Sequence, residues 1–433
     1  MRYYSTNGKA PLASLREAVV NGLAPDRGLY MPERIKPMSK VFFRDLRNLS
    51  LQDTALAVAL HFFGEDVEPE ALERIVYGAL NFRIPAVEVS SRVCSLELFH
   101  SPTLAFKDVG ARFMARLLSY FNEYESDTVN VLVATSGDTG SAVANGFLGV
   151  DGVRVFVLYP KGRVSPIQEC QFTTLGQNIT ALEIDGTFDD CQALVKSAFM
   201  DAELAARMKL TSANSINVAR FLPQSFYYYH GVGQMQKMGR GEDLVICVPS
   251  GNFGNICSAL FAVRTGLPVK RMIAANNRND VFLQYLETGV YTPRPSIPTL
   301  ANAMDVGDPS NFARILDLYG GDWNAIRSFI SGQSVDDDTI MAVIRDCRWQ
   351  TGYILDPHGA CGYKALTDGL CDGENGLFCE TAHPAKFKDT VEKATDQPVG
   401  IPGRLAAFMQ GEKRSVPLPA DFQAFKAYLA DQA

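Results

Sequence analysis

The pattern of apolar and polar residues changes along the chain. Over the first 85 residues, apolar positions recur mostly at helical spacing, as in residues 12–20 and 54–63. A Pro- and Arg-containing patch at residues 83–85 marks the end of this part. The pattern therefore predicts a mostly helical N-terminal extension over residues 1–85.

Beyond this extension, short apolar runs alternate with helical segments. The runs at 129–134, 153–159 and 244–248 are rich in β-branched residues, which favour strands. A Thr-x-x-acid pattern at Thr187 predicts the start of a helix that runs to Met200. This alternation predicts an α/β fold with two open, mainly parallel sheets flanked by helices. Ligands of such sheets bind beyond the carboxyl ends of the strands.

Composition narrows the classes of function. The chain has 433 residues, enough for two or three domains, and a net charge of −7 without a long basic run. We therefore expect no nucleic-acid partner, whereas a small anionic substrate remains compatible. The nine cysteines include no Cys-x-x-Cys, which disfavours a disulfide framework and a zinc site. These thiols, and an N-terminus without the apolar core of a signal peptide, predict a cytoplasmic protein.

One uncharged stretch, Leu244–Val263, is long enough to compare with a membrane span. Pro249, Gly251 and Gly254 interrupt it, and a spanning helix would leave backbone groups there unsatisfied in lipid. The stretch is better explained as strand, loop and helix, so we expect no membrane partner.

The same stretch contains the first candidate for chemistry. Motifs of nucleotide triphosphatases, α/β-hydrolases, dinucleotide-binding domains and zinc proteases are missing from the chain. The loop at 248–255 instead follows a strand and opens a helix, and its glycines let consecutive N–H groups point into one cavity. A helix N-terminus adds partial positive charge. The loop is therefore either a phosphate site or a tight structural turn.

Two further segments are candidates. The Gly-rich turn at 135–141 offers hydroxyl and N–H groups that could hold a carboxylate, although an N-capping turn would have the same composition. Asp138 would repel an anion, so we expect it to face a hydroxyl or a protonated group. Lys107 follows an apolar run, and burial of such a lysine lowers the pKa of its amine and makes it a nucleophile. A lone lysine can equally be an ordinary surface residue.

Taken together, these segments resemble threonine synthase, a family of fold-type II enzymes that depend on pyridoxal 5′-phosphate (PLP). The similarity begins with Tyr4-Ser5-Thr6 and residues 22–32, and it covers essentially the whole chain. The matching motifs are Leu98–Asp108, Thr135–Gly140, Asn214–Arg220, Pro249–Asn255 and Thr381–Phe387.

The resemblance implies a role for each matching residue. Lys107 would carry the cofactor as a Schiff base, and Thr381 would bond its pyridine nitrogen. The cofactor phosphate would be held by Gly251, Asn252, Phe253, Gly254 and Asn255, the last of which is Asp in many relatives. Asp138, which is Asn in some relatives, would meet the cofactor ring hydroxyl. Substrate would be bound by Ser136, Gly137 and Thr139 at its carboxylate and by Asn214, Ser215 and Arg220 at its phosphate. His100 and His383 lie in matching motifs and are expected to be structural.

The resemblance also implies the reaction, the domains and the assembly. We expect a lyase that converts O-phospho-L-homoserine and water to L-threonine and phosphate, the last step of threonine biosynthesis. A phospholyase that releases 2-oxobutyrate, or a non-catalytic PLP-binding homologue, are the alternatives. We expect a smaller mobile domain at 110–205 and a large PLP-binding domain at 86–109 and 206–433. The chain would be a monomer or a homodimer that binds no metal.

Overall fold

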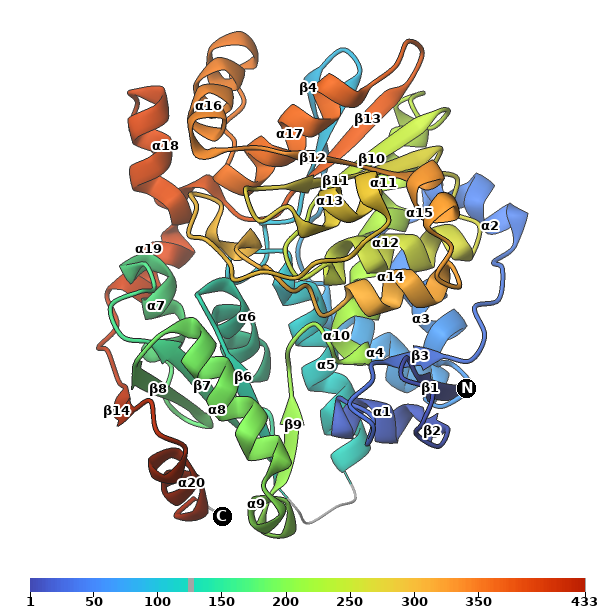
Figure 1. The fold of residues 1–433 in the computed structure, drawn as a ribbon. Helices are drawn as coiled ribbons and strands as arrows, with labels where there is room; N and C mark the ends of the chain where they lie inside the picture. The colour runs from blue at the N-terminus through green and yellow to red at the C-terminus, as the bar shows by residue number, and fades with distance from the viewer. Residues whose placement is uncertain (124–127, 433) are drawn as a thin grey trace. The chain divides into compact units, whose positions relative to one another are not determined.

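A computed structural model describes residues 1–123 and 128–432 (Figure 1). The chain divides into two compact units. Unit 1 comprises Met1, Met31–Phe106 and Phe221–Gly400, and unit 2 comprises Arg2–Tyr30, Lys107–Arg220 and Ile401–Ala433. The domain boundaries expected from the sequence stay a prediction, because a division into compact units does not show which part of the chain moves.

Unit 1 is built on a six-stranded sheet in the order β12-β11-β10-β13-β5-β4. All neighbouring strands are parallel except the edge pair β4 and β5. This arrangement confirms the mainly parallel sheet expected from the alternating pattern. The strands are β4 (Ala86–Ser90), β5 (Val93–Glu97), β10 (Leu244–Pro249), β11 (Arg271–Asn276), β12 (Ile330–Ser334) and β13 (Asn375–Glu380).

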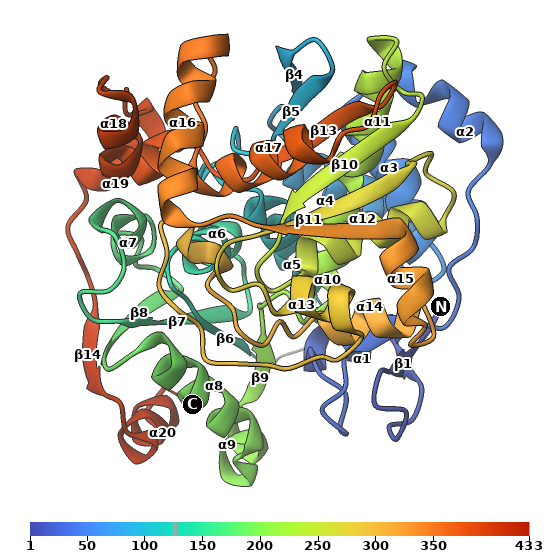
Figure 2. The ribbon, with the colours of Figure 1, turned by 45° about the horizontal axis from the view of Figure 1, so that its top comes forward.

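Helices cover both faces of this sheet, as Figure 2 shows for α17. Gly362 of α17 packs near Phe378 of β13, whereas Gly231 of α11 packs near Leu377. Since successive strand residues point to opposite faces, the two helices lie on opposite sides. The helices of unit 1 are α2 (Lys40–Asp45), α3 (Leu51–Phe63), α4 (Pro69–Ala79), α11 (Ser225–Lys237), α12 (Gly254–Arg264), α13 (Val281–Thr288), α14 (Phe312–Leu318), α15 (Trp323–Phe329), α16 (Asp337–Thr351), α17 (Pro357–Gly369) and α18 (Lys388–Thr395), with 3-10 turns η1 (Leu46–Asn48), η2 (Leu222–Gln224), η3 (Asn302–Met304) and η4 (Pro384–Phe387).

Unit 2 contains a five-stranded parallel sheet in the order β14-β8-β7-β6-β9. Apolar side chains of its strands form a core with α8, α9 and α20. The strands are β6 (Val129–Ala134), β7 (Val153–Pro160), β8 (Ile179–Asp185), β9 (Lys209–Ser212) and β14 (Val416–Pro419). The helices are α1 (Leu15–Asn21), α5 (Lys107–Asn122), α6 (Asp138–Phe147), α7 (Pro166–Thr173), α8 (Phe188–Met200), α9 (Ala202–Arg207), α10 (Val218–Phe221), α19 (Gly403–Met409) and α20 (Phe422–Ala430).

The N-terminal extension is helical in α1 to α4 but also contains strands that the pattern did not predict. β1 (Arg2–Ser5), β2 (Ala13–Ser14) and β3 (Tyr30–Pro32) form a small sheet in the order β2-β1-β3. Strands of two to four residues do not contain enough positions to show an alternation of apolar and polar residues. Across residues 1–123 and 128–432, no helix combines the length and apolarity that crossing a membrane requires.

Candidate active site

In unit 1, three of the predicted site segments meet at one edge of the sheet. β5, β13 and β10 are parallel neighbours, so their carboxyl ends lie at the same edge. Residues 98–106 follow β5, the loop 250–253 follows β10, and Thr381 follows β13. The topology thus brings the segment before Lys107, the Gly-rich loop and Thr381 together, although they are far apart in the sequence.

The loop after β10 turns sharply into α12. Phe253 has a left-handed backbone with φ of 62°, and α12 begins at Gly254 with no capping side chain from the described residues. Gly251 is closely packed, since a Cβ there would lie 2.7 Å from Cα of Met304 and 2.8 Å from the Ala303 oxygen. The loop therefore requires glycine at 251.

Two tyrosines fix Asn255 in the first turn of α12. The hydroxyls of Tyr227 and Tyr228 donate to Asn255 Oδ1 at 2.5 and 2.6 Å. Burial raises the pKa of both phenols well above its usual range, so both remain protonated donors. Asn255 Nδ2 is buried and has no hydrogen-bond partner among the described residues. The sequence did not reveal these tyrosines, because they lie on α11, well before the loop.

The segment before Lys107 is bound to the segment after β13. The Phe106 N–H donates to the backbone oxygen of Thr381, and the His383 N–H donates to the backbone oxygen of Leu104, each at 3.0 Å. Leu104 itself has a left-handed backbone with φ of 59°. The buried amine of Lys386 donates to the Thr103 oxygen at 3.0 Å. These bonds fix the chain directly before Lys107, which is the half-buried first residue of α5.

Unit 2 brings the predicted substrate-binding segments together. β6 and β9 are parallel neighbours, so the turn after β6, with Ser136 and Gly137, lies beside the turn after β9, with Asn214 and Ser215. Thr139 follows in the first turn of α6. The hydroxyl oxygen of Thr135 accepts from the N–H groups of Gly137 and Gly140 at 2.9 and 2.8 Å. Gly137 adopts φ of 145°, a conformation that side chains rarely allow.

Asp138, the first residue of α6, has a partner that the sequence did not indicate. The Gln168 amide, from α7, donates to Asp138 Oδ1 at 2.9 Å. Asp138 is only 5% exposed. The carboxylate thus accepts from a neutral amide, and this donor comes from a segment with no recognisable motif.

Arg220 is buried in α10, the short helix that follows the turn after β9. Its Nη1 donates to the Ala213 oxygen. Burial lowers the pKa of its guanidinium to about 10, and the buried Asp108 carboxylate opposes this shift. Arg220 therefore stays charged at neutral pH. Arg220 is therefore not an exposed arginine in a surface ion pair, which is the usual role of an isolated arginine on a helix.

His100 and His383 contact neighbouring protein groups, and their structural role stays a prediction. The His100 Nε2 lies 2.7 Å from Glu97 Oε2, and His383 Nδ1 accepts from the Ala385 N–H at 3.1 Å. Burial lowers the pKa of His383 to about 4, so its ring is neutral. Among the described residues, no group of three His, Cys, Asp or Glu side chains is arranged to hold a metal ion.

Comparison with known proteins identifies the class of the site. The family described as pyridoxal-phosphate dependent enzyme matches residues 86–376. This match agrees with the fold-type II class, to which the two mainly parallel sheets belong. Families described as threonine synthase N terminus and threonine synthase, C-terminal match residues 2–80 and 359–429. The chain belongs to the threonine synthase family.

Individual relatives agree over the full length. Threonine synthase from Escherichia coli (strain K12) is 42% identical over 426 residues, which cover 98% of each chain. The crystal structure of threonine synthase from Escherichia coli matches with a TM-score of 0.93 and covers 100% of both chains. A PLP-bound threonine synthase from Brucella melitensis, 36% identical, matches with a TM-score of 0.94 over 100% of this chain and 99% of that one.

Proposed function

We propose that the protein converts O-phospho-L-homoserine and water to L-threonine and phosphate, with PLP bound at Lys107. The family is one of PLP-dependent lyases, and its threonine synthase members match this chain from end to end. The nine free thiols support placing this activity in the cytoplasm.

The residues of the loop after β10 fit a cofactor phosphate. The N-terminus of α12 presents N–H groups without a capping side chain from the described residues, and the buried Asn255 Nδ2 is a donor still in need of an acceptor. A dianionic phosphate supplies acceptors for both. We assign the phosphate to Gly251, Asn252, Phe253, Gly254 and Asn255, the pyridine nitrogen to Thr381, and the ring hydroxyl to Asp138.

The turns of unit 2 fit the two anionic ends of the substrate. Ser136, Gly137 and Thr139 offer hydroxyl and N–H donors for the carboxylate. Asn214, Ser215 and Arg220 would bind the phosphate, for which a planar, permanently charged guanidinium is suited. The observation that carries the proposal is this buried Arg220 charge, next to a hydroxyl-lined turn at the ends of two adjacent parallel strands.

The chemistry divides between cofactor and protein. When bound, PLP supplies an electron sink for a carbanion at the substrate Cα. The Lys107 amine, released by the substrate amine, is the base that we assign to the protons on Cα and then Cβ. Arg220 would stabilise the phosphate as it leaves from Cγ. Protons are returned to Cγ and to Cα, and water adds its hydroxyl at Cβ while its remaining proton goes to the departing phosphate. Control of that water separates a synthase from a phospholyase.

Product analysis tests the proposal. We expect the purified holoenzyme to form L-threonine and phosphate in equal amounts from O-phospho-L-homoserine, and Lys107→Ala to form neither. Lys426→Met, at a half-buried lysine of α20 that pairs with Asp201, is the matched control and should still form both products. Release of 2-oxobutyrate and ammonia in place of threonine would identify a phospholyase. Absence of turnover together with absence of the cofactor's visible absorbance would identify a non-catalytic homologue.

A further inference from the structure

Residues 299–311, here named the supporting loop, pack against residues 250–253, here named the phosphate loop. A Cβ on Gly251 would meet Met304 and Ala303 of this loop. The Ser310 N–H donates to the side-chain oxygen of Asn252, Oδ1, at 2.7 Å. Asn311 Nδ2 donates to the backbone oxygen of Asn252 at 2.9 Å. The shape of the phosphate loop therefore depends on where the supporting loop lies.

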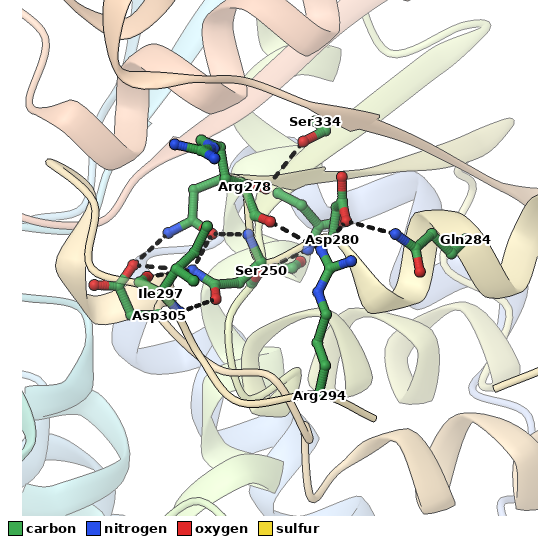
Figure 3. Close-up of polar contacts among 11 residues, drawn as sticks. Ser250, Arg278, Asp280, Gln284, Arg294, Ile297, Asp305 and Ser334 are labelled. Carbon is green, nitrogen blue, oxygen red and sulfur yellow. Dashed lines mark hydrogen bonds and ion pairs between the residues drawn. The ribbon is translucent and has the colours of Figure 1, made fainter. Parts of the chain in front are cut away.

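The supporting loop has almost no regular structure of its own. The short turn η3 is its one helical element among the described residues. Polar side chains hold it instead, and Figure 3 shows the half-buried Asp305 among them. Asp305 Oδ1 accepts from Asn277 Nδ2 at 2.8 Å and from the Thr299 hydroxyl at 2.7 Å. Asn279 Nδ2 donates to the same oxygen at 3.2 Å.

His358 holds the loop from its other side. The imidazole is 2% exposed and lies in the first turn of α17. Its Nε2 lies 3.2 Å from the Ala303 backbone nitrogen, and its Nδ1 lies 2.5 Å from Asp356 Oδ1. A backbone N–H can only donate, so Nε2 must be the unprotonated acceptor and Nδ1 must carry the proton. The Asp356 carboxylate selects this tautomer.

Asp356 is itself fixed in place. It is fully buried and caps α17, accepting from the His358 N–H at 2.7 Å. Its own N–H donates to Glu380 Oε1 at 2.6 Å. Glu380 directly precedes Thr381, so the same contacts connect the pyridine end of the proposed cofactor site with its phosphate end.

We propose that Asp356 and His358 are a positioning pair that holds the supporting loop against Gly251 and Asn252 and so sets how tightly the cofactor phosphate is bound. The inference rests on the proposed function only in naming that phosphate as the ligand of the loop. His358 acts through the Ala303 N–H rather than by touching the cofactor. A change at His358 should therefore loosen the supporting loop and weaken phosphate binding together.

The variant His358→Phe tests this inference, because it keeps a ring against Phe387 but removes both ring nitrogens. Hydrogen–deuterium exchange of the peptide that spans Ala303 should rise in the cofactor-free protein. The Kd for pyridoxamine 5′-phosphate, which cannot form a bond with Lys107, should rise roughly three- to tenfold, as expected for one lost hydrogen bond. His61→Phe is the matched control, since His61 Nε2 also bonds a backbone group, the Lys36 oxygen at 2.8 Å, but on α3.

Several results would overturn the inference. Unchanged exchange at Ala303, or faster exchange with an unchanged Kd, would each contradict it. A lower Tm without a change in Kd would show that His358 only stabilises the fold. If His358→Phe does not fold, Asp305→Asn provides the same two measurements from the other anchor of the loop. A wild-type protein that binds no pyridoxamine 5′-phosphate would contradict the proposed function itself. Equal Kd values for wild type and variant would instead contradict only the role of His358.

Discussion

At the scale of single residues, the site contains two side-chain-bearing residues in left-handed backbone conformations. Leu104 lies three residues before Lys107, and Phe253 precedes the first residue of α12. Such conformations cost about 1–3 kcal/mol each and persist where the surroundings impose them. Phe253 is held by a ring contact with Phe282 at 4.8 Å, and Leu104 by the bonds to the segment after β13. Both strained residues adjoin positions assigned to the cofactor.

Gly251 is the residue whose replacement the packing forbids most clearly. In Gly251→Ala the new Cβ would lie 2.7 Å from a backbone atom of Met304, so either loop must shift. We expect the Kd for PLP to rise at least about tenfold, a cost of about 1.4 kcal/mol. Gly400→Ala is the control, because a Cβ there meets no described atom within 4 Å. Equal PLP titrations of the two variants would contradict the assigned loop.

Arg220 provides a second prediction at this scale. Arg220→Ala should raise the KM for O-phospho-L-homoserine roughly tenfold to a hundredfold, since a charge-assisted hydrogen bond contributes about 1.5–3 kcal/mol. PLP absorbance should persist, because the cofactor phosphate is assigned to unit 1. Steady-state kinetics with substrate and inhibition by inorganic phosphate measure the effect. An unchanged KM in a destabilised protein would make Arg220 a purely structural residue.

At the scale of elements, the sequence predicted what local patterns encode. β6 has the expected bounds, Val129–Ala134, and α8 ends at Met200 as expected from its start at Thr187. β7 extends one residue further, through Pro160, because that residue still pairs with β8. The uncharged stretch from Leu244 is strand, loop and helix, as its Pro and Gly residues indicated.

Elements without a local pattern could not be predicted. The supporting loop is held at its own Asp305 by Asn277 and at its Ala303 by His358, and these two partners come from distant segments and match no motif. Gln168 reaches Asp138 in the same way, from α7. Periodicity detects the faces of helices and strands, whereas these polar contacts exist only after the sheet has brought separate loops together.

The start of α8 yields a prediction at this scale. The Thr187 hydroxyl accepts from the Asp190 N–H at 3.2 Å, and Asp190 Oδ2 accepts from the Thr187 N–H at 2.7 Å. Thr187→Ala should lower the free energy of unfolding by about 1 kcal/mol in urea titrations, since it removes half of this capping box. Thr292→Ala, in an exposed loop, should change it far less. Equal stabilities of the two variants would show that the cap contributes nothing.

At the scale of the whole molecule, each unit has predicted site segments at the carboxyl ends of parallel strands. In unit 1 these segments are the loop after β10 and Thr381, and in unit 2 they are the turns after β6 and β9. The alternating pattern predicted this class of fold, and the motifs predicted which loops matter. The order of the strands, and therefore which loops are neighbours, required the structure.

The central claim is that Lys107 carries the cofactor, and reductive labelling tests it most directly. Borohydride fixes PLP on the lysine that holds it, and mass analysis of peptides from the purified protein locates the label. We expect a pyridoxyl group on Lys107 alone. Lys386, a buried lysine whose amine already donates to the Thr103 oxygen, should remain unlabelled. A label on Lys386, or the absence of any labelled lysine in a protein that shows PLP absorbance, would contradict the assignment of the cofactor to Lys107.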